Sequence, residues 1–87
     1  MKASGLSGKL TAGGREVATL GRWSLEYERG VATITAALQA HNAYWFDHAP
    51  AFDVRLDVGG HVMRWRNVTV TREGEDVTII GKGAPNA

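Results

Sequence analysis

The sequence predicts a mainly β protein: a small antiparallel β-sandwich or partly closed β-barrel of six to seven strands with at most one short helix. Residues 22–28 and 52–58 alternate apolar and polar side chains at every position, which is the period of a strand with one buried face. Glycine-containing pairs separate the extended stretches, as tight hairpin turns require. Short antiparallel strands joined in this order build a sandwich or a barrel rather than a parallel sheet.

The length of 87 residues predicts a single domain over 1–87, with a folded core at 8–82 and flexible arms at 1–7 and 83–87. The absence of cysteine excludes disulfides and cysteine-ligated metal sites. A net charge of +1 argues against nucleic-acid binding through bulk charge. No run approaches the roughly 20 apolar residues of a membrane span, and the first residues lack the apolar run of a signal peptide. We therefore expect synthesis in the cytoplasm and no membrane partner.

The first hairpin is predicted over residues 8–20, with its turn at Gly13-Gly14, where two residues of positive φ are needed. Counting outward from this turn places Leu10 opposite Val17 on the buried face. Gly21 ends the stretch.

The second hairpin is predicted to join residues 22–28 to residues 31–36. Arginine is a poor first residue for a type I′ turn, so the turn is either the pair Arg29-Gly30 or a longer loop in which Gly30 takes the positive φ. Counting from the two-residue turn puts Tyr27 opposite Ala32, Leu25 opposite Ile34 and Trp23 opposite Ala36, so each aromatic side chain faces an alanine.

Residues 36–46 favour a short helix or helical turn, because the run Ala-Ala-Leu-Gln-Ala is good helix material and Leu38 and Trp45 are seven positions apart. The alternative is an extension of the preceding strand followed by a loop, since Asn42 and the aromatic run after it fit a helix less well. Pro50 closes the segment, because proline disfavours a helical residue before it.

Residues 52–80 are predicted to form two further hairpins. The Gly59-Gly60 turn of the first places Leu56 opposite Met63, Val54 opposite Trp65 and Asp53 opposite Arg66. In the second, Glu73-Gly74-Glu75-Asp76 is read as a four-residue loop. The apolar positions change parity between these hairpins, which requires a bulge or a sharp bend near Arg66-Asn67.

The inward positions of these strands give the predicted core. Its members are Leu10, Val17, Trp23, Leu25, Tyr27, Ile34, Phe52, Val54, Leu56, Met63, Trp65, Val70 and Ile79.

The titratable residues form no catalytic or metal-binding pattern. Asp53 and Asp57 share one strand face, but at about 3.3 Å per residue they lie roughly 13 Å apart, beyond the spacing of a glycosidase pair. The spacing of His41, Asp47 and His48 matches no known zinc-ligand set. No serine is placed beside a histidine that could activate it. We therefore expect no enzymatic activity, and no catalytic, metal-binding or cofactor-binding residue.

Three consecutive aromatic residues are the first candidates for an interface. Tyr44, Trp45 and Phe46 cannot all face one core in either a helix or a strand. In one interpretation two of them pack inward and one covers the sheet edge. In the other, at least one is buried by another chain.

Arg55, Arg64 and Arg66 form the second candidate interface, because they share one predicted sheet face. Small barrels bind single-stranded nucleic acid through arginine and aromatic side chains on one surface. Trp65, however, points to the opposite face and is predicted to be core. Binding of single-stranded nucleic acid through this arginine face is therefore the alternative function, and nucleic acid is not the partner that we expect first.

The segment from Gly8 to Leu20, leading into Trp23-Ser24-Leu25, resembles the opening of the tail tube proteins of tailed bacteriophages and their small relatives. Residues 52–56, the run Asn67-Val68-Thr69-Val70 and the Gly81-Lys82-Gly83 exit are also similar to that group. The resemblance implies a β-barrel or sandwich whose sheets join between subunits into rings.

This resemblance also implies a function. It predicts a non-enzymatic structural protein located in a phage virion, either tail tube-like, or a minor tail or baseplate component, or a protein that decorates the capsid. Its expected partners are copies of itself in a ring or lattice and other virion proteins.

Overall fold

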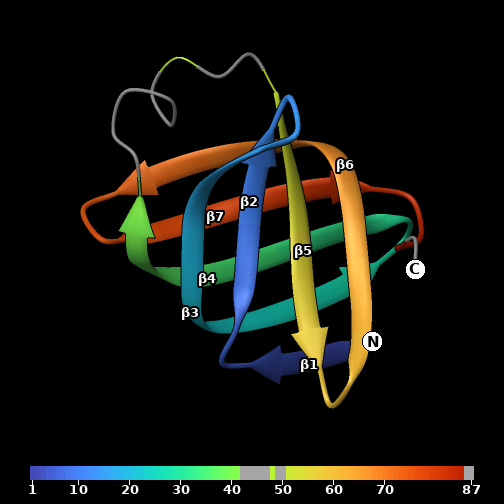
Figure 1. The fold of residues 1–87 in the computed structure, drawn as a ribbon. Helices are drawn as coiled ribbons and strands as arrows, with labels where there is room; N and C mark the ends of the chain where they lie inside the picture. The colour runs from blue at the N-terminus through green and yellow to red at the C-terminus, as the bar shows by residue number, and fades with distance from the viewer. Residues whose placement is uncertain (42–47, 49–50, 86–87) are drawn as a thin grey trace.

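The computed structural model describes residues 1–41, 48 and 51–85. These residues form seven β-strands, which Figure 1 shows in chain order. They are β1 (Lys2–Gly5), β2 (Gly8–Ala12), β3 (Arg15–Glu28), β4 (Val31–His41), β5 (Phe52–Val58), β6 (His61–Glu73) and β7 (Asp76–Lys82).

Six of the strands close into an antiparallel barrel, so the predicted mainly β fold is confirmed in its barrel form. The order around the barrel is β3-β2-β5-β6-β7-β4, and β4 returns to pair with β3. The seventh strand, β1, pairs with β3 outside this ring. In Figure 1, β2 and β5 run across the direction of β4 and β7. The barrel therefore consists of two layers whose strands cross, as in orthogonally packed sheets.

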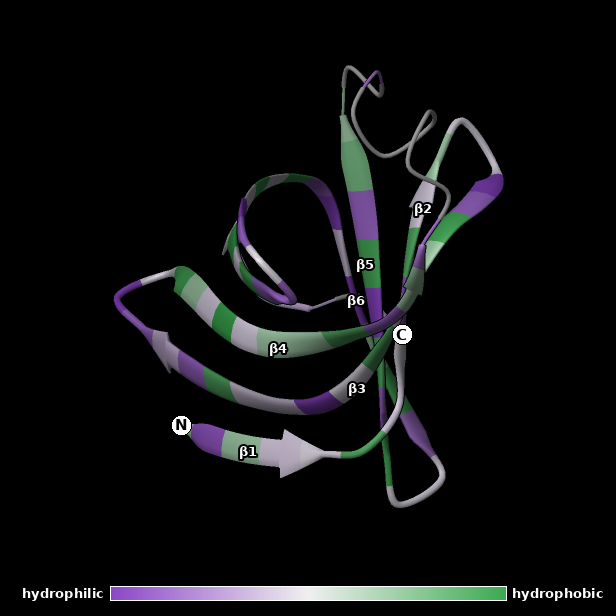
Figure 2. Ribbon diagram, turned by 90° about the vertical axis from the view of Figure 1, so that its left-hand side faces the viewer, coloured by the Kyte–Doolittle hydropathy of each residue, from purple (hydrophilic) through white to green (hydrophobic). Residues whose placement is uncertain are grey.

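β3 and β6 are long enough to belong to both layers. Residues 15–20 of β3 pair with β2, whereas residues 23–26 pair with β1. Residues 61–65 of β6 pair with β5, whereas residues 69–73 pair with β7. We call the layer of β2, β5 and the first halves of β3 and β6 the first sheet. The second sheet contains β1, β4, β7 and the second halves of β3 and β6, and Figure 2 shows β1, β3 and β4 side by side in it.

A bulge turns β6 from one sheet into the other, as the change of parity predicts. Asn67 has a φ of 55°, and the pairing register between β5 and β6 shifts between Phe52 and Val54. The backbone N–H of Asn67 donates to Oδ1 of Asp53 over 3.1 Å. The predicted pair of Asp53 with Arg66 is therefore wrong, because the extra residue of the bulge interrupts the ladder there.

The predicted registers hold close to the turns of the β3–β4 and β5–β6 hairpins. Leu56 lies opposite Met63 and Val54 opposite Trp65. In the β3–β4 hairpin all three predicted pairs are present, and the turn is the two-residue pair Arg29-Gly30. The loop after Glu73 is shorter than predicted, because Glu73 itself pairs with the first residue of β7.

The first hairpin departs from prediction by one residue. Leu10 lies opposite Ala18 instead of Val17, because the ladder shifts between Leu10 and Thr11. The extra residue lets both Val17 and Ala18 reach the interior, so both are buried. Alternation alone could not show this, since a bulge breaks the period on which alternation depends.

The core fills the space between the two sheets. Ten of the thirteen predicted core residues are buried, and Tyr27, Met63 and Val70 are half-buried against them. Seven further residues are buried in this core: Ala18, Leu20, Ala32, Ala36, Leu38, Val68 and Val77.

Two buried tryptophans hold the two ends of the chain against the barrel. Nε1 of Trp23 donates to the carbonyl oxygen of Ser7 over 2.8 Å, and the same indole lies against Gly5. Nε1 of Trp65 donates to the carbonyl oxygen of Gly83 over 2.9 Å. Each indole therefore finds the hydrogen-bond acceptor that burial demands, and each acceptor belongs to a segment that the sequence had assigned to an arm.

The predicted arms are accordingly corrected. The arm at 1–7 is wrong for Lys2–Gly5, which form β1 in regular pairing with β3. The arm at 83–87 is wrong at its first residue, because the N–H of Gly83 also donates to the carbonyl oxygen of Gly30 over 2.8 Å. Residues 86–87 lie outside the described part of the chain.

The predicted helix over residues 36–46 is wrong for residues 36–41, which belong to β4. Pairing with β3 along this stretch, and with β7 at residues 36–37, favours the strand there and overrides the helix propensity of the alanines. The alternative of a strand extension is confirmed to His41, and residues 42–46 lie outside the described residues.

Candidate functional site

A row of three cations crosses the outer face of the first sheet. Lys9 of β2 lies directly opposite Arg55 of β5, and Arg55 lies directly opposite Arg64 of β6. Directly opposite residues of antiparallel strands have Cβ atoms about 4.5 to 5.5 Å apart and point to the same face. We call Lys9, Arg55 and Arg64 the cationic row. The sequence predicted the two arginines but not Lys9, because no local turn sets the pairing of β2 with β5.

Arg66 lines the same hollow as this row. The hollow has a volume of about 230 Å³ and is lined by Lys9, Thr11, Gly14, Asp53, Val54, Arg55, Arg64 and Arg66. The structure therefore brings together all three arginines that the sequence proposed as one face, and adds a lysine to them.

The acids on this face neutralise only part of the row. Nζ of Lys9 lies 3.8 Å from Oε2 of Glu16, and Nε of Arg55 lies 3.4 Å from Oδ1 of Asp57. Nε of Arg55 is buried and makes no hydrogen bond with the described residues. Among the described residues, no carboxylate forms an ion pair with Arg64.

The predicted position of Trp65 is confirmed, since its side chain is only 1% exposed. Its indole fills the core behind the cationic row and donates its N–H to Gly83, so it cannot stack on a base. The other described aromatic residues, Trp23, Tyr27 and Phe52, are buried or half-buried.

The free edge of β1 is a second candidate surface. Met1 and Tyr27 exchange both backbone hydrogen bonds, with N–O distances of 2.9 and 2.8 Å. Hydrogen-bonded pairs alternate along an antiparallel ladder, so Ala3 and Gly5 also direct their backbone groups toward β3. The N–H and C=O groups of Lys2 and Ser4 therefore point away from β3, to an edge that pairs with no strand of the described residues.

Two exposed apolar side chains flank this edge. Met1 is 61% exposed and Leu6 is 75% exposed, and both rank among the exposed large apolar residues of the described chain. β1 contains no proline, and its ladder with β3 has no bulge. Its one charged residue, Lys2, stands at its first position. Proline and bulges, two features by which proteins block strand edges, are therefore absent from this edge, and only its shortness and Lys2 protect it.

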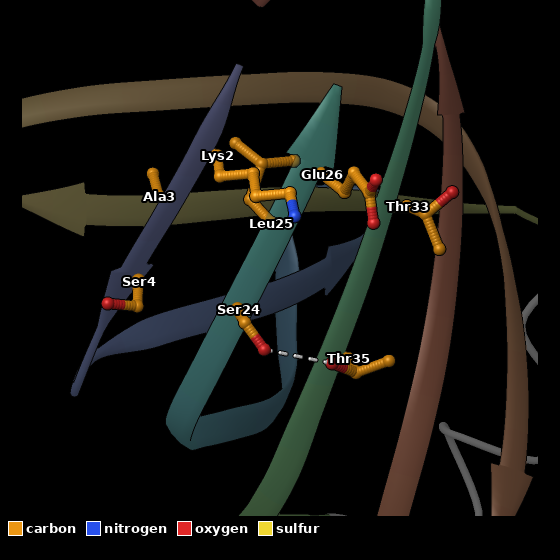
Figure 3. Close-up of a pocket in the computed structure, with 8 residues that line it drawn as sticks. All are labelled: Lys2, Ala3, Ser4, Ser24, Leu25, Glu26, Thr33 and Thr35. Carbon is orange, nitrogen blue, oxygen red and sulfur yellow. Dashed lines mark hydrogen bonds between the residues drawn. The ribbon is translucent and has the colours of Figure 1, made fainter. Parts of the chain in front are cut away.

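The outer face beside β1 contains hydroxyl groups and one charge of each sign (Figure 3). Its hollow of about 420 Å³ is lined by Lys2, Ala3, Ser4, Ser24, Leu25, Glu26, Thr33 and Thr35. Oγ of Ser24 lies 3.1 Å from Oγ1 of Thr35, so the serine hydroxyl is bonded to another hydroxyl. None of the described residues that line this hollow is a histidine, the usual base for activating a serine.

The remaining residues that the sequence singled out are the three consecutive aromatics and the histidines. Tyr44, Trp45 and Phe46 lie outside the described residues. Nε2 of His41 lies 3.2 Å from Nη1 of Arg72, so this histidine is hydrogen-bonded within the fold. Across residues 1–41, 48 and 51–85, no three acidic, histidine or cysteine side chains are grouped so as to hold a metal ion.

In comparisons with known proteins, the chain matches no protein-family model, no curated protein and no solved structure. Within the described part of the chain, no helix combines the length and the apolar character that crossing a membrane requires.

Proposed function

We propose that this chain is a non-enzymatic structural protein that acts by assembling with copies of itself. Following the resemblance of its sequence, we place this assembly in a phage virion, as a tail tube-like, minor tail, baseplate or capsid-associated component. The observation that carries the proposal is the free edge of β1, which stands beside a barrel that is otherwise closed.

A second copy fits this edge because the edge is complementary to itself. When two β1 strands run antiparallel with Ala3 facing Ala3 at a two-fold axis, Lys2 of each copy faces Ser4 of the other. All the outward N–H and C=O groups of Lys2 and Ser4 are then paired. Alanine at the axis leaves room for the close approach, because opposite residues come within about 4.5 to 5.5 Å.

The same arrangement gathers exposed apolar residues at the two ends of the contact. In this register Met1 of one copy lies opposite Gly5 of the other, one position from the exposed Leu6. A strand of four residues makes a small contact. Each contact is therefore weak, and a lattice in which every copy makes several contacts gains strength from their number.

The test is sedimentation at increasing protein concentration, with two proline variants. Ser4→Pro removes only an outward N–H, which an edge strand tolerates, and should leave a folded monomer. Ala3→Pro removes an N–H that faces β3 and should instead weaken the β1–β3 ladder. We expect the parent protein to associate reversibly and Ser4→Pro not to associate.

A parent protein that stays monomeric at every concentration would contradict self-assembly. Association that persists unchanged in Ser4→Pro would show that the copies meet elsewhere, and would remove β1 as the contact. A monomer that binds only when a different virion protein is added would assign the edge to that protein and would also overturn pairing between copies.

A further inference from the structure

The cationic row contradicts the ordinary rule for strand pairing. Like charges that lie directly opposite each other on adjacent strands destabilise a sheet, and Arg55 has a cation opposite it on both sides. The barrel closes through backbone pairing and its apolar core. Neither of these needs a charged residue at the three positions of the cationic row. Local departures from such rules concentrate at functional sites, where a ligand offsets the loss of stability.

We propose that the cationic row, together with Arg66, binds the phosphate groups of a nucleic-acid backbone. Strands lie about 4.8 Å apart, so the row extends roughly 10 Å across β2, β5 and β6. A single phosphate group is too small to contact all the cations in a line of this length. Successive phosphates of one nucleic-acid strand can contact them together. Two of the row's members are arginines, whose planar guanidinium matches the geometry of phosphate oxygens.

Three features of the residues around the row favour anions as the ligand. The ion pair of Arg55 with Asp57 is long, at 3.4 Å, and includes no hydrogen bond from the buried Nε, so it neutralises Arg55 only in part. Arg64 has no ion pair with a described carboxylate. Thr11 adds a hydroxyl donor to the lining of the same hollow.

The residue types that line this hollow also indicate how a nucleic acid would bind. All the aromatic side chains of the described residues are buried or half-buried, and none lines this hollow. The described residues therefore offer this face no base stacking, which gives single-strand binders much of their affinity. We expect binding through phosphates alone, with little dependence on base sequence and a steep dependence on salt.

This proposal does not depend on assembly through β1. The row lies on the outer face of the first sheet, whereas β1 extends the second sheet from the side of β3. Binding can accordingly be measured on the Ser4→Pro variant, whose β1 edge is blocked, as well as on the parent chain.

The test measures the fluorescence anisotropy of a labelled oligothymidylate and of a labelled duplex over a series of salt concentrations. Arg64→Gln removes one member of the row. Arg22→Gln is the matched control, because it changes the net charge equally at an exposed position that lines a hollow on the second sheet. We expect Arg64→Gln to weaken binding roughly three- to tenfold and to lower the salt slope by about one unit, and Arg22→Gln to change neither.

The temperature of thermal unfolding distinguishes an arginine that binds a ligand from one that only stabilises the fold. Removing Arg64 relieves the repulsion with Arg55, so Arg64→Gln should unfold at a higher temperature while it binds more weakly. A lower unfolding temperature would mean that Arg64 serves the fold, and would overturn the argument for the site.

Three further outcomes would overturn the proposal. The first is no binding of either oligonucleotide at low salt. The second is an equal loss in Arg64→Gln and Arg22→Gln, which would reduce the effect to bulk charge. The third is displacement of the oligonucleotide by inorganic phosphate at the same total concentration of phosphate groups. It would mean that the row binds a single phosphoryl group and not a nucleic-acid backbone.

Discussion

At the scale of single residues, the clearest departure from local preference is Arg29. Its φ is 53° and that of Gly30 is 75°, so both central residues of the turn lie in the left-handed region. A type I′ turn needs this at both positions, but only glycine, asparagine and aspartate adopt it readily. The sequence therefore left a longer loop open as the alternative, whereas the register of β3 and β4 leaves only these two residues in the turn.

Replacing Arg29 should therefore stabilise the protein. Arg29→Asn gives the turn the Asn-Gly pair that type I′ hairpins prefer, and we expect the free energy of unfolding to rise by about 0.5 to 1 kcal/mol. Gly30→Ala is the opposite control, because it forces a side chain into φ 75° and should lower stability by about 1 kcal/mol. Urea denaturation measures both changes. No gain from Arg29→Asn would mean that the turn holds Arg29 without strain.

At the scale of elements, β1 depends on the packing of a glycine against a tryptophan. A Cβ atom on Gly5 would lie 2.6 Å from Cζ2 of Trp23 and 2.9 Å from Nε1 of the same ring. The indole cannot move aside easily, because it is 1% exposed and its N–H donates to Ser7. Residue 5 must therefore be glycine if β1 is to pair with β3 along its whole length.

Gly5→Ala should release β1 from the barrel. We expect the free energy of unfolding to fall by about 1 to 3 kcal/mol, the usual range for overpacking. The backbone amides of Ala3 and residue 5, which face β3, should exchange with solvent faster, while those of β4 and β7 stay protected. Ser4→Ala is the control, since its side chain lies on the outer face. Unchanged exchange at Ala3 would contradict this role for Gly5.

At the scale of the whole molecule, closure leaves β1 as the one strand of the described residues outside the ring. A domain of this size buries a small core and has a small free energy of unfolding. Contacts between copies therefore make a measurable addition to its stability. Association that occurs only in the folded state raises the apparent stability by mass action.

The midpoint of thermal unfolding should therefore rise with protein concentration. The same series on Ser4→Pro should give a midpoint that does not change with concentration, because the blocked edge leaves only the monomer. Calorimetry at several concentrations measures both. A constant midpoint in the parent protein would count against assembly through folded monomers.

Local patterns predicted the parts of the molecule that depend on near neighbours. Turn glycines fixed the pairs of the β3–β4 and β5–β6 hairpins, and the change of parity at Arg66-Asn67 located the bulge. The arginine face was predicted from the same alternation. Lys9 was missed, because β2 meets β5 only through closure of the barrel.

The amino-acid sequence by itself determined most of the strands, the tight turns and most of the core, because alternation and positive-φ turn residues act over a few positions. Only the tertiary structure decided that the ring closes, that Lys2–Gly5 are a strand and that residues 36–41 extend β4. Each of these depends on pairing with a strand distant in sequence. Backbone hydrogen bonds to such a partner override local propensity, and no local pattern records which partner it is.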